Sequence, residues 1–170
     1  MDEDRFGVVE CDEDRWKVSF VRRIDRPVEK VWAALTVSER VADWLGQLTL
    51  EPRIGGRYDV LFVVPPETMT AIITAFEPPR LLEYRFNGVE DPRGAMVRWE
   101  LEPDGAGACR LTLVQFGLPR HKVADAASSW HDFIEMISAA ADGVATPYDV
   151  PRWQALLALY ETRLAGQLGD

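Results

Sequence analysis

The chain has only two histidines, His121 and His131, so acid–base or metal chemistry by imidazole is confined to these two positions. His131 and Glu135 stand one helical turn apart, but one imidazole and one carboxylate do not complete a zinc site, which takes four ligands. We expect His131, Asp132 and Glu135 on the solvent side of a helix. His121 is expected in a loop before that helix, where it could serve as an acid or base at the mouth of a cavity.

The motifs of common enzyme classes are missing from the sequence. It contains no nucleophile elbow, phosphate loop, dinucleotide fingerprint or zinc motif. Gly55 and Gly56 are typical of a turn. The carboxylates of Asp43, Glu51 and Glu83 are candidate acids, although sequence alone does not place two of them face to face. We predict no metal and no cofactor, and leave open whether the protein is an enzyme.

Three polar residues stand on expected strands among apolar neighbours. Arg85 and Arg98 alternate with large aromatics, which predicts that both face solvent; the alternative is that one reaches inward to hold a carboxylate or phosphate. Gln115 shares its parity with Leu111 and Leu113, so it is expected to point inward. A buried glutamine needs hydrogen-bond partners and could orient a ligand.

Composition limits the class of partner. The 170 residues carry a net charge of −9, which argues against nucleic acid or an anionic membrane as partner. No apolar run approaches the length of a membrane span, and the acidic start at Met1 to Asp4 is unlike a signal peptide, so we expect a cytoplasmic protein without membrane insertion. Cys11 and Cys109 are expected to be reduced thiols, with a single disulfide as the alternative.

The elements that must position these residues follow from hydrophobic periodicity. A helix over 124–141 carries an apolar stripe of Trp130, Phe133, Ile134 and Ile137 at helical spacing. Two short helices are expected from Pro27 and Ser38. Period-two alternation predicts strands over 15–24, 48–51, 58–63, 68–76, 82–86, 97–101 and 110–116.

These elements predict an α+β fold, with an antiparallel meander of strands wrapped around the helix over 124–141. Residues 1–13 are an acidic N-terminal arm or a weak first strand, and 150–168 form an extra C-terminal helix. We expect residues 1–170 to be one domain, because no repeat or long linker interrupts the chain.

Four stretches resemble the START-like superfamily, also called helix-grip or SRPBCC. Within it, the chain is similar to the family named for homologues of the activator of heat-shock-protein-90 ATPase. The similarity covers roughly residues 15–143, in stretches that begin at Val31, Pro52, Phe76 and Ser128: VWAALTVSERVADWLG, PRIGGRYDV, FEPPRLLEYRF and SSWHDFIEMISAA. The resemblance implies a curved antiparallel sheet of six to seven strands that grips the C-terminal helix, with a cavity between them.

The implied cavity suggests a set of lining residues. They are mostly aromatic and lie on the expected strands and helices, and the alternative for each is plain core packing. Trp32 and Trp44 are best explained by packing of the short helices against the sheet edge. The candidates are Trp32, Trp44, Tyr58, Phe62, Met69, Tyr84, Phe86, Trp99, Gln115, Trp130, Phe133 and Ile137.

The resemblance implies binding of a small hydrophobic or amphipathic molecule, such as a lipid, between sheet and helix. Two other functions stay open: a cyclase- or hydrolase-type enzyme of the same fold, and a chaperone-linked interaction module related to stress response. The protein is expected to be a monomer or a homodimer. The helix over 150–168 would then close one cavity mouth or form an oligomer contact.

Overall fold

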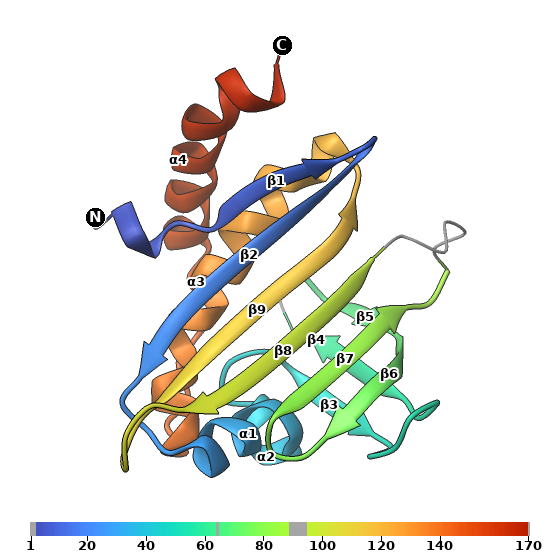
Figure 1. Cartoon of the computed structure of the whole chain (residues 1–170), viewed down its shortest axis with the longest axis vertical. Coiled ribbons are helices and arrows are strands. Elements are labelled where there is room, and N and C mark those ends of the chain that lie inside the picture. Colours follow the sequence, from blue (N-terminus) through green and yellow to red (C-terminus); the bar gives the residue numbers. More distant parts are fainter. Residues whose placement is uncertain (1–2, 64, 89–94, 170) are drawn as a thin grey trace.

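The computed structural model describes residues 3–63, 65–88 and 95–169. Its largest part is a six-stranded antiparallel sheet, which Figure 1 shows face-on. The strands follow in the order β1 (Val8–Asp12), β2 (Arg15–Ile24), β9 (Cys109–Leu118), β8 (Met96–Pro103), β7 (Leu81–Phe86) and β6 (Ala71–Glu77). The pairing of β2 with β9 therefore joins the N-terminal part of the chain to a strand about 90 residues later.

The two faces of this sheet differ as the alternating sequence predicts. Inward side chains such as Phe20, Leu111 and Leu113 are buried. On the outer face, the Arg98 guanidinium forms ion pairs with Glu83 at 2.9 Å and Glu100 at 2.7 Å. The expectation that Arg98 faces solvent is confirmed, and its charge is balanced by Glu100 on its own strand and by Glu83 on the neighbouring β7.

A second, three-stranded sheet contains β3 (Gln47–Leu50), β4 (Tyr58–Phe62) and β5 (Glu67–Met69). The prediction of one strand over 68–76 is therefore wrong, because the chain leaves this sheet after Met69 and enters the large one as β6. The nearly buried Asp59 joins the two sheets: its Oδ1 accepts the Ala71 N–H at 3.2 Å. Periodicity shows that a segment is extended, but it does not show a change of partner strand.

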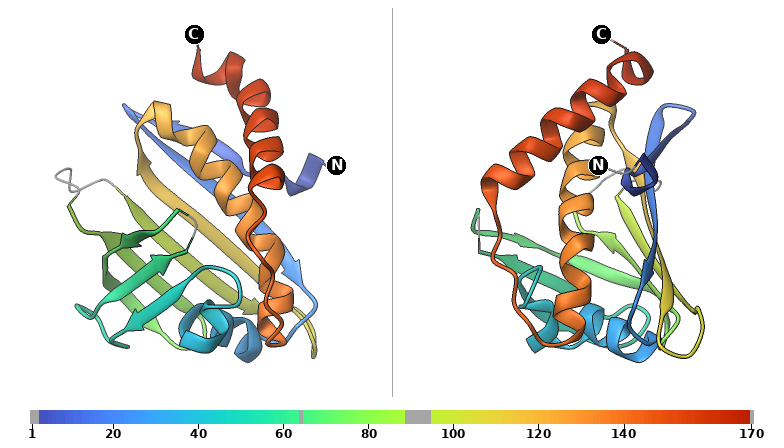
Figure 2. Two further views of the ribbon diagram at one scale, coloured as in Figure 1. Left: turned by 180° about the vertical axis from the view of Figure 1, so that it is seen from behind. Right: turned by 90° about the vertical axis from the view of Figure 1, so that its left-hand side faces the viewer.

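Helix α3 (Val123–Ala141) crosses the inner face of the large sheet, as Figure 2 shows from behind, and this confirms the predicted helix over 124–141. Helices α1 (Val28–Thr36) and α2 (Ser38–Val41) close one end of the space between sheet and α3. The two short 3₁₀ turns are η1 (Glu3–Arg5) and η2 (Arg120–Lys122). The α+β helix-grip architecture is confirmed.

The expected C-terminal helix is α4 (Val150–Leu168), which begins with an Asp149 side chain that accepts the Arg152 N–H at 3.1 Å. It packs on the side of α3 that faces away from the sheet (Figure 2, right) and buries Leu156, Tyr160 and Leu164. Among the described residues, no helix combines the length and apolarity that crossing a membrane requires.

Helix α4 also overturns one expectation. His131 and Asp132 do not face solvent: they are 3% and 1% exposed, because α4 covers the polar side of α3. The covered groups are paired, since His131 contacts the Tyr160 hydroxyl and Asp132 forms an ion pair with Arg152. An amphipathic pattern separates apolar from polar residues, but a polar face can be buried by another helix that supplies polar partners.

The N-terminal arm is ordered over the part that the structure describes. Residues 8–12 pair with β2 as a true edge strand, and residues 3–7 turn onto α3 and α4. Residues 1 and 2 of the expected arm lie outside the described part. Cys11 is exposed and Cys109 is buried, and both are free thiols, as expected.

Candidate functional site

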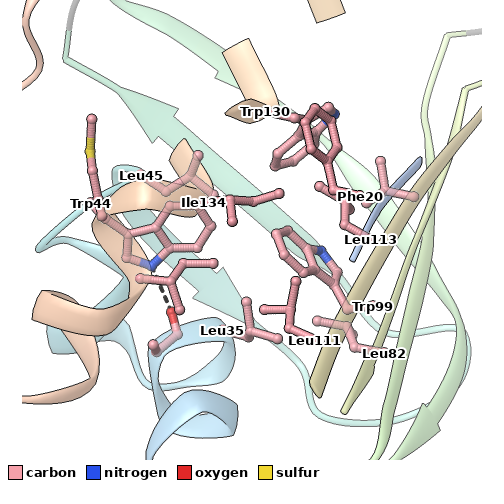
Figure 3. Packing of buried hydrophobic residues seen from close by; sticks show 14 of the residues in the cluster. Phe20, Leu35, Trp44, Leu45, Leu82, Trp99, Leu111, Leu113, Trp130 and Ile134 are labelled. Atoms are coloured by element: carbon pink, nitrogen blue, oxygen red, sulfur yellow. Dashed lines mark hydrogen bonds between the residues drawn. The ribbon is translucent and has the colours of Figure 1, made fainter. Parts of the chain in front are cut away.

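Five aromatic side chains meet between α3 and the two sheets. They come from the turn after α2 (Trp44), β4 (Phe62), β8 (Trp99) and α3 (Trp130 and Phe133), and we call them the aromatic cluster. Ring centroids of neighbouring members lie 5.4 to 6.5 Å apart, mostly edge to face, the arrangement that aromatic quadrupoles favour. Figure 3 shows three of them, Trp44, Trp99 and Trp130, among the surrounding leucines.

Hydrogen bonds donated by the indole N–H groups fix the orientation of two of these rings. Trp44 Nε1 donates to the Ala34 carbonyl at 2.7 Å, the dashed line in Figure 3, and so ties the turn after α2 to α1. Trp99 Nε1 lies 3.3 Å from the Tyr84 hydroxyl. A buried indole N–H without an acceptor is costly, so these partners hold each ring in one orientation.

Beside the cluster, Tyr58 and Tyr84 stack with their ring centroids 4.4 Å apart. The Tyr58 hydroxyl donates to the Leu35 carbonyl at 2.7 Å, and Phe86 packs edge-on against Tyr84. Burial raises the pKa of both tyrosines well above the usual value. Both therefore stay neutral and serve as hydrogen-bonding apolar walls, not as acids near neutral pH.

Gln115 supplies the polar group of the site. It is 9% exposed and faces inward, as its strand parity predicts, and its Oε1 accepts the Trp130 Nε1–H at 2.6 Å. Its amide nitrogen donates no hydrogen bond to another described residue. This nitrogen is not fully buried. The amide N–H₂ of Gln115, beside Trp130, therefore has no donor bond to another described residue and is partly accessible to solvent.

The predicted set differs in exposure. Tyr58, Tyr84, Trp99 and Ile137 are fully buried. Five others are only half-buried and come from α1, β4, β5, β7 and α3: Trp32, Phe62, Met69, Phe86 and Phe133.

Trp32 lies apart from the aromatic cluster. Its ring contacts Phe76 on the edge strand β6 at 5.6 Å, which confirms the interpretation that it packs a short helix against the sheet edge. Trp44 also packs against a short helix, through its bond to Ala34 of α1, but its ring contacts Trp99 on the interior strand β8 and not the sheet edge. Among the described residues, the Trp32 ring has no ring contact with another member of the predicted set.

Two pockets of about 540 Å³ each lie elsewhere in the described part of the chain. One is formed by the β1–β2 hairpin and β9, around Trp16 and Phe116. The other lies between β1 and α4, around Phe6, Tyr160 and Leu164. Neither is lined by the predicted set, so a cavity-lining role for that set stays a prediction that requires half-buried side chains to move.

Sequence reasoning missed Tyr148, which lies 6.1 Å from Phe133 between ring centroids and extends the aromatic cluster toward α4. It also missed the contact of His131 with Tyr160. Tyr148 lies in the connection between α3 and α4, which has no periodicity to indicate what it packs against. The apolar positions of α4 did indicate a buried face, but not that α3 supplies polar partners beneath it.

Comparison with known proteins identifies the family to which the sequence is similar. The family model described as activator of Hsp90 ATPase homolog 1-like protein matches residues 25–142. No curated protein matches the sequence closely enough to count as a relative.

Similar solved structures span nearly the whole fold. CalU16 from Micromonospora echinospora has a TM-score of 0.72 at 18% identity, over 94% of this chain and 96% of its own. EF2215 from Enterococcus faecalis, a conserved protein of unknown function, has 0.73 at 15% identity over 96% and 92%. MLL2253 from Mesorhizobium loti has 0.65 at 27% identity over 74% and 96%.

Proposed function

The chain belongs to the family of activator of Hsp90 ATPase homolog 1-like proteins, and from that premise we propose that it binds a small hydrophobic or amphipathic molecule between α3 and the sheets. The observation that carries the proposal is the inward-facing amide of Gln115, whose Oε1 accepts the Trp130 Nε1–H at 2.6 Å among buried aromatic side chains. Small-molecule sites commonly combine apolar walls with a few such orienting groups.

The affinity would come from apolar burial. At about 25 cal/mol per Å², a ligand that buries roughly 300 Å² of apolar surface gains about 8 kcal/mol before the cost of association. The half-buried Phe62 and Phe133 face each other across the approach between β4 and α3, at 6.5 Å between ring centroids. Their displacement toward solvent is the movement by which a ligand would enter.

Binding fits the site better than turnover does. Within the described residues, the ring contacts of the aromatic cluster include no histidine, and burial raises the pKa of both tyrosines beside it. Acid–base catalysis needs a group whose pKa lies near the working pH. Gln115 can orient a carbonyl or hydroxyl group of a ligand, but it cannot accept a proton from it.

The test begins with native mass spectrometry of the purified protein, followed by denaturing extraction of any bound molecule. Candidate ligands are then titrated against tryptophan fluorescence, because Trp44, Trp99 and Trp130 report directly on the cluster. We expect saturable quenching by an apolar ligand that carries a hydrogen-bond acceptor. Absence of binding by every apolar acid, alcohol and ketone in the screen would refute the proposal.

Two variants locate the site. Phe133→Ala should weaken binding about tenfold, since one side of the approach is removed, corresponding to about 1.4 kcal/mol. The matched control is Leu159→Ala, because Leu159 is an exposed apolar residue of α4, on the far side of α3, and should leave the titration unchanged. Equal losses in both variants would place the ligand elsewhere.

A further inference from the structure

A hydrogen-bonded chain links the N-terminal arm to α3 and α4. The Gly7 N–H donates to the Tyr160 hydroxyl at 2.8 Å, and that hydroxyl lies 2.9 Å from His131 Nδ1. Tyr160 and His131 are almost fully buried, so water cannot easily replace these bonds. Gly7 lies in the N-terminal arm, Tyr160 on α4 and His131 on α3, so these bonds tie the arm to both helices.

The directions of these bonds follow from the donors available. Because the Tyr160 oxygen accepts from Gly7, its own hydrogen is free to be donated to His131 Nδ1. Burial raises the pKa of Tyr160 to about 12, so it keeps this hydrogen. His131 is then neutral with its proton on Nε2, which lies 3.9 Å from Glu135 Oε1.

Other contacts hold the same arm without His131 as a hydrogen-bond partner. The Arg163 guanidinium binds both Glu3 carboxylate oxygens at 3.0 and 2.8 Å, and Arg5 forms an ion pair with Glu135. Phe6 lies edge-on against His131 and Tyr160, beneath Arg163 at 3.9 Å. The ion pairs are partly exposed, so each is worth little on its own.

The surroundings of His131 disfavour a second proton. Positive charges face it from β2 (Arg22) and from the arm (Arg5), while Glu135 and Asp132 on α3 oppose them and Tyr160 on α4 is neutral. The Arg22 side chain is 10% exposed, and its Nε donates no hydrogen bond among the described residues. Burial and then Arg22 lower the pKa of His131.

We propose that residues 3–7 form a strap that is released when His131 is protonated. A proton on Nδ1 removes the acceptor for the Tyr160 hydroxyl and places a cation beside Arg22 in a buried site. Release of the arm relieves both effects, because it admits water to the imidazolium and removes Arg5 from its vicinity. It also removes Phe6 and Gly7 from the pocket between β1 and α4, which becomes more open. This inference does not depend on the proposed ligand site.

The test measures hydrogen exchange of the Gly7 amide by NMR from pH 8 to pH 5, corrected for the intrinsic pH dependence of exchange. In the wild-type protein we expect protection to fall on the order of tenfold or more as His131 titrates, since local opening sets the exchange rate. His131→Gln keeps an acceptor for Tyr160 but does not titrate, so its Gly7 protection should stay constant. His121→Gln replaces the other, exposed histidine and should respond like the wild type.

Two results would overturn the proposal. One is constant protection of Gly7 in the wild type while the ring resonances of His131 report protonation. The other is an equal loss of protection in His131→Gln, which would assign the pH response to the ion pairs. If His131→Gln does not fold, Tyr160→Phe decides: it should exchange fast at Gly7 already at pH 8, and a wild-type pH response in this variant would refute the strap.

Discussion

The hydrogen bond between Gln115 and Trp130 allows a quantitative test of the site, through the variant Trp130→Phe. The bond is 2.6 Å long and lies between two residues that are each 9% exposed. The variant loses a neutral hydrogen bond worth about 1 kcal/mol and leaves the Gln115 oxygen unpaired at a cost of about 1–2 kcal/mol. We therefore expect it to lower the free energy of unfolding by roughly 2–3 kcal/mol.

The double variant Trp130→Phe with Gln115→Leu separates the two effects. Gln115→Leu alone should cost about 2 kcal/mol, because it leaves the Trp130 N–H unpaired. In the double variant no unpaired polar atom remains, so its cost should fall short of the sum by about 1–2 kcal/mol. Replacement of both partners by apolar groups removes the penalty for burying a polar atom alone.

Urea unfolding followed by far-ultraviolet circular dichroism measures these differences. With a slope of about 2 kcal/mol per M, the single variants should shift the midpoint by roughly 1 M. The slope itself should not change, since the variants alter stability and not the surface exposed on unfolding. Strictly additive costs would show that the two side chains do not depend on each other, and would refute the reasoning about the polar group of the site.

Three further outcomes are expected. His131 has a pKa lowered by burial, so the unfolded chain binds its proton first and stability is lost as the pH falls below about 6.5; His131→Gln should flatten that slope in urea titrations. In the native protein a thiol reagent should modify only Cys11, because Cys109 is buried and its pKa is raised to about 11; modification of both thiols at equal rates would contradict the structure. Tyr58→Phe should cost about 1–3 kcal/mol in thermal or urea unfolding, because the buried Leu35 carbonyl loses its donor; an unchanged stability would show that water reaches that carbonyl.

Hydrophobic periodicity over short stretches of sequence predicts most of the helices and strands of this fold. The apolar stripe that includes Trp130 and Ile137 predicts α3 to within one residue of its start, and strand parity predicts that Gln115 points inward. The stretch over 68–76 was misassigned as one strand, because alternation is the same whichever sheet a segment joins. The burial of His131 does not follow from the pattern, because it depends on contacts with α4, the N-terminal arm and β2 that local periodicity does not indicate.

The candidate site was only partly predictable for the same reason. Pattern analysis indicates that Trp99 and Phe133 are on inner faces, but the contacts that join them to Trp44 and Phe62 cross between elements distant in sequence. Local sequence also gives no measure of how completely side chains fill a cavity. The two pockets that the described residues form lie at the β1–β2 hairpin and beside α4, where no motif indicated them.

The pairing of β2 with β9 has a kinetic consequence. Ile24 pairs with Cys109 and Trp16 with Leu118, so the middle of the large sheet forms only after most of the chain has been synthesised. Contacts between such distant residues must overcome a large loss of chain entropy before they contribute stability, which slows folding to the range of about milliseconds to seconds. Until β9 emerges, the hairpin of β1 and β2 presents an unpaired edge, and the nascent chain depends on late residues to cover it.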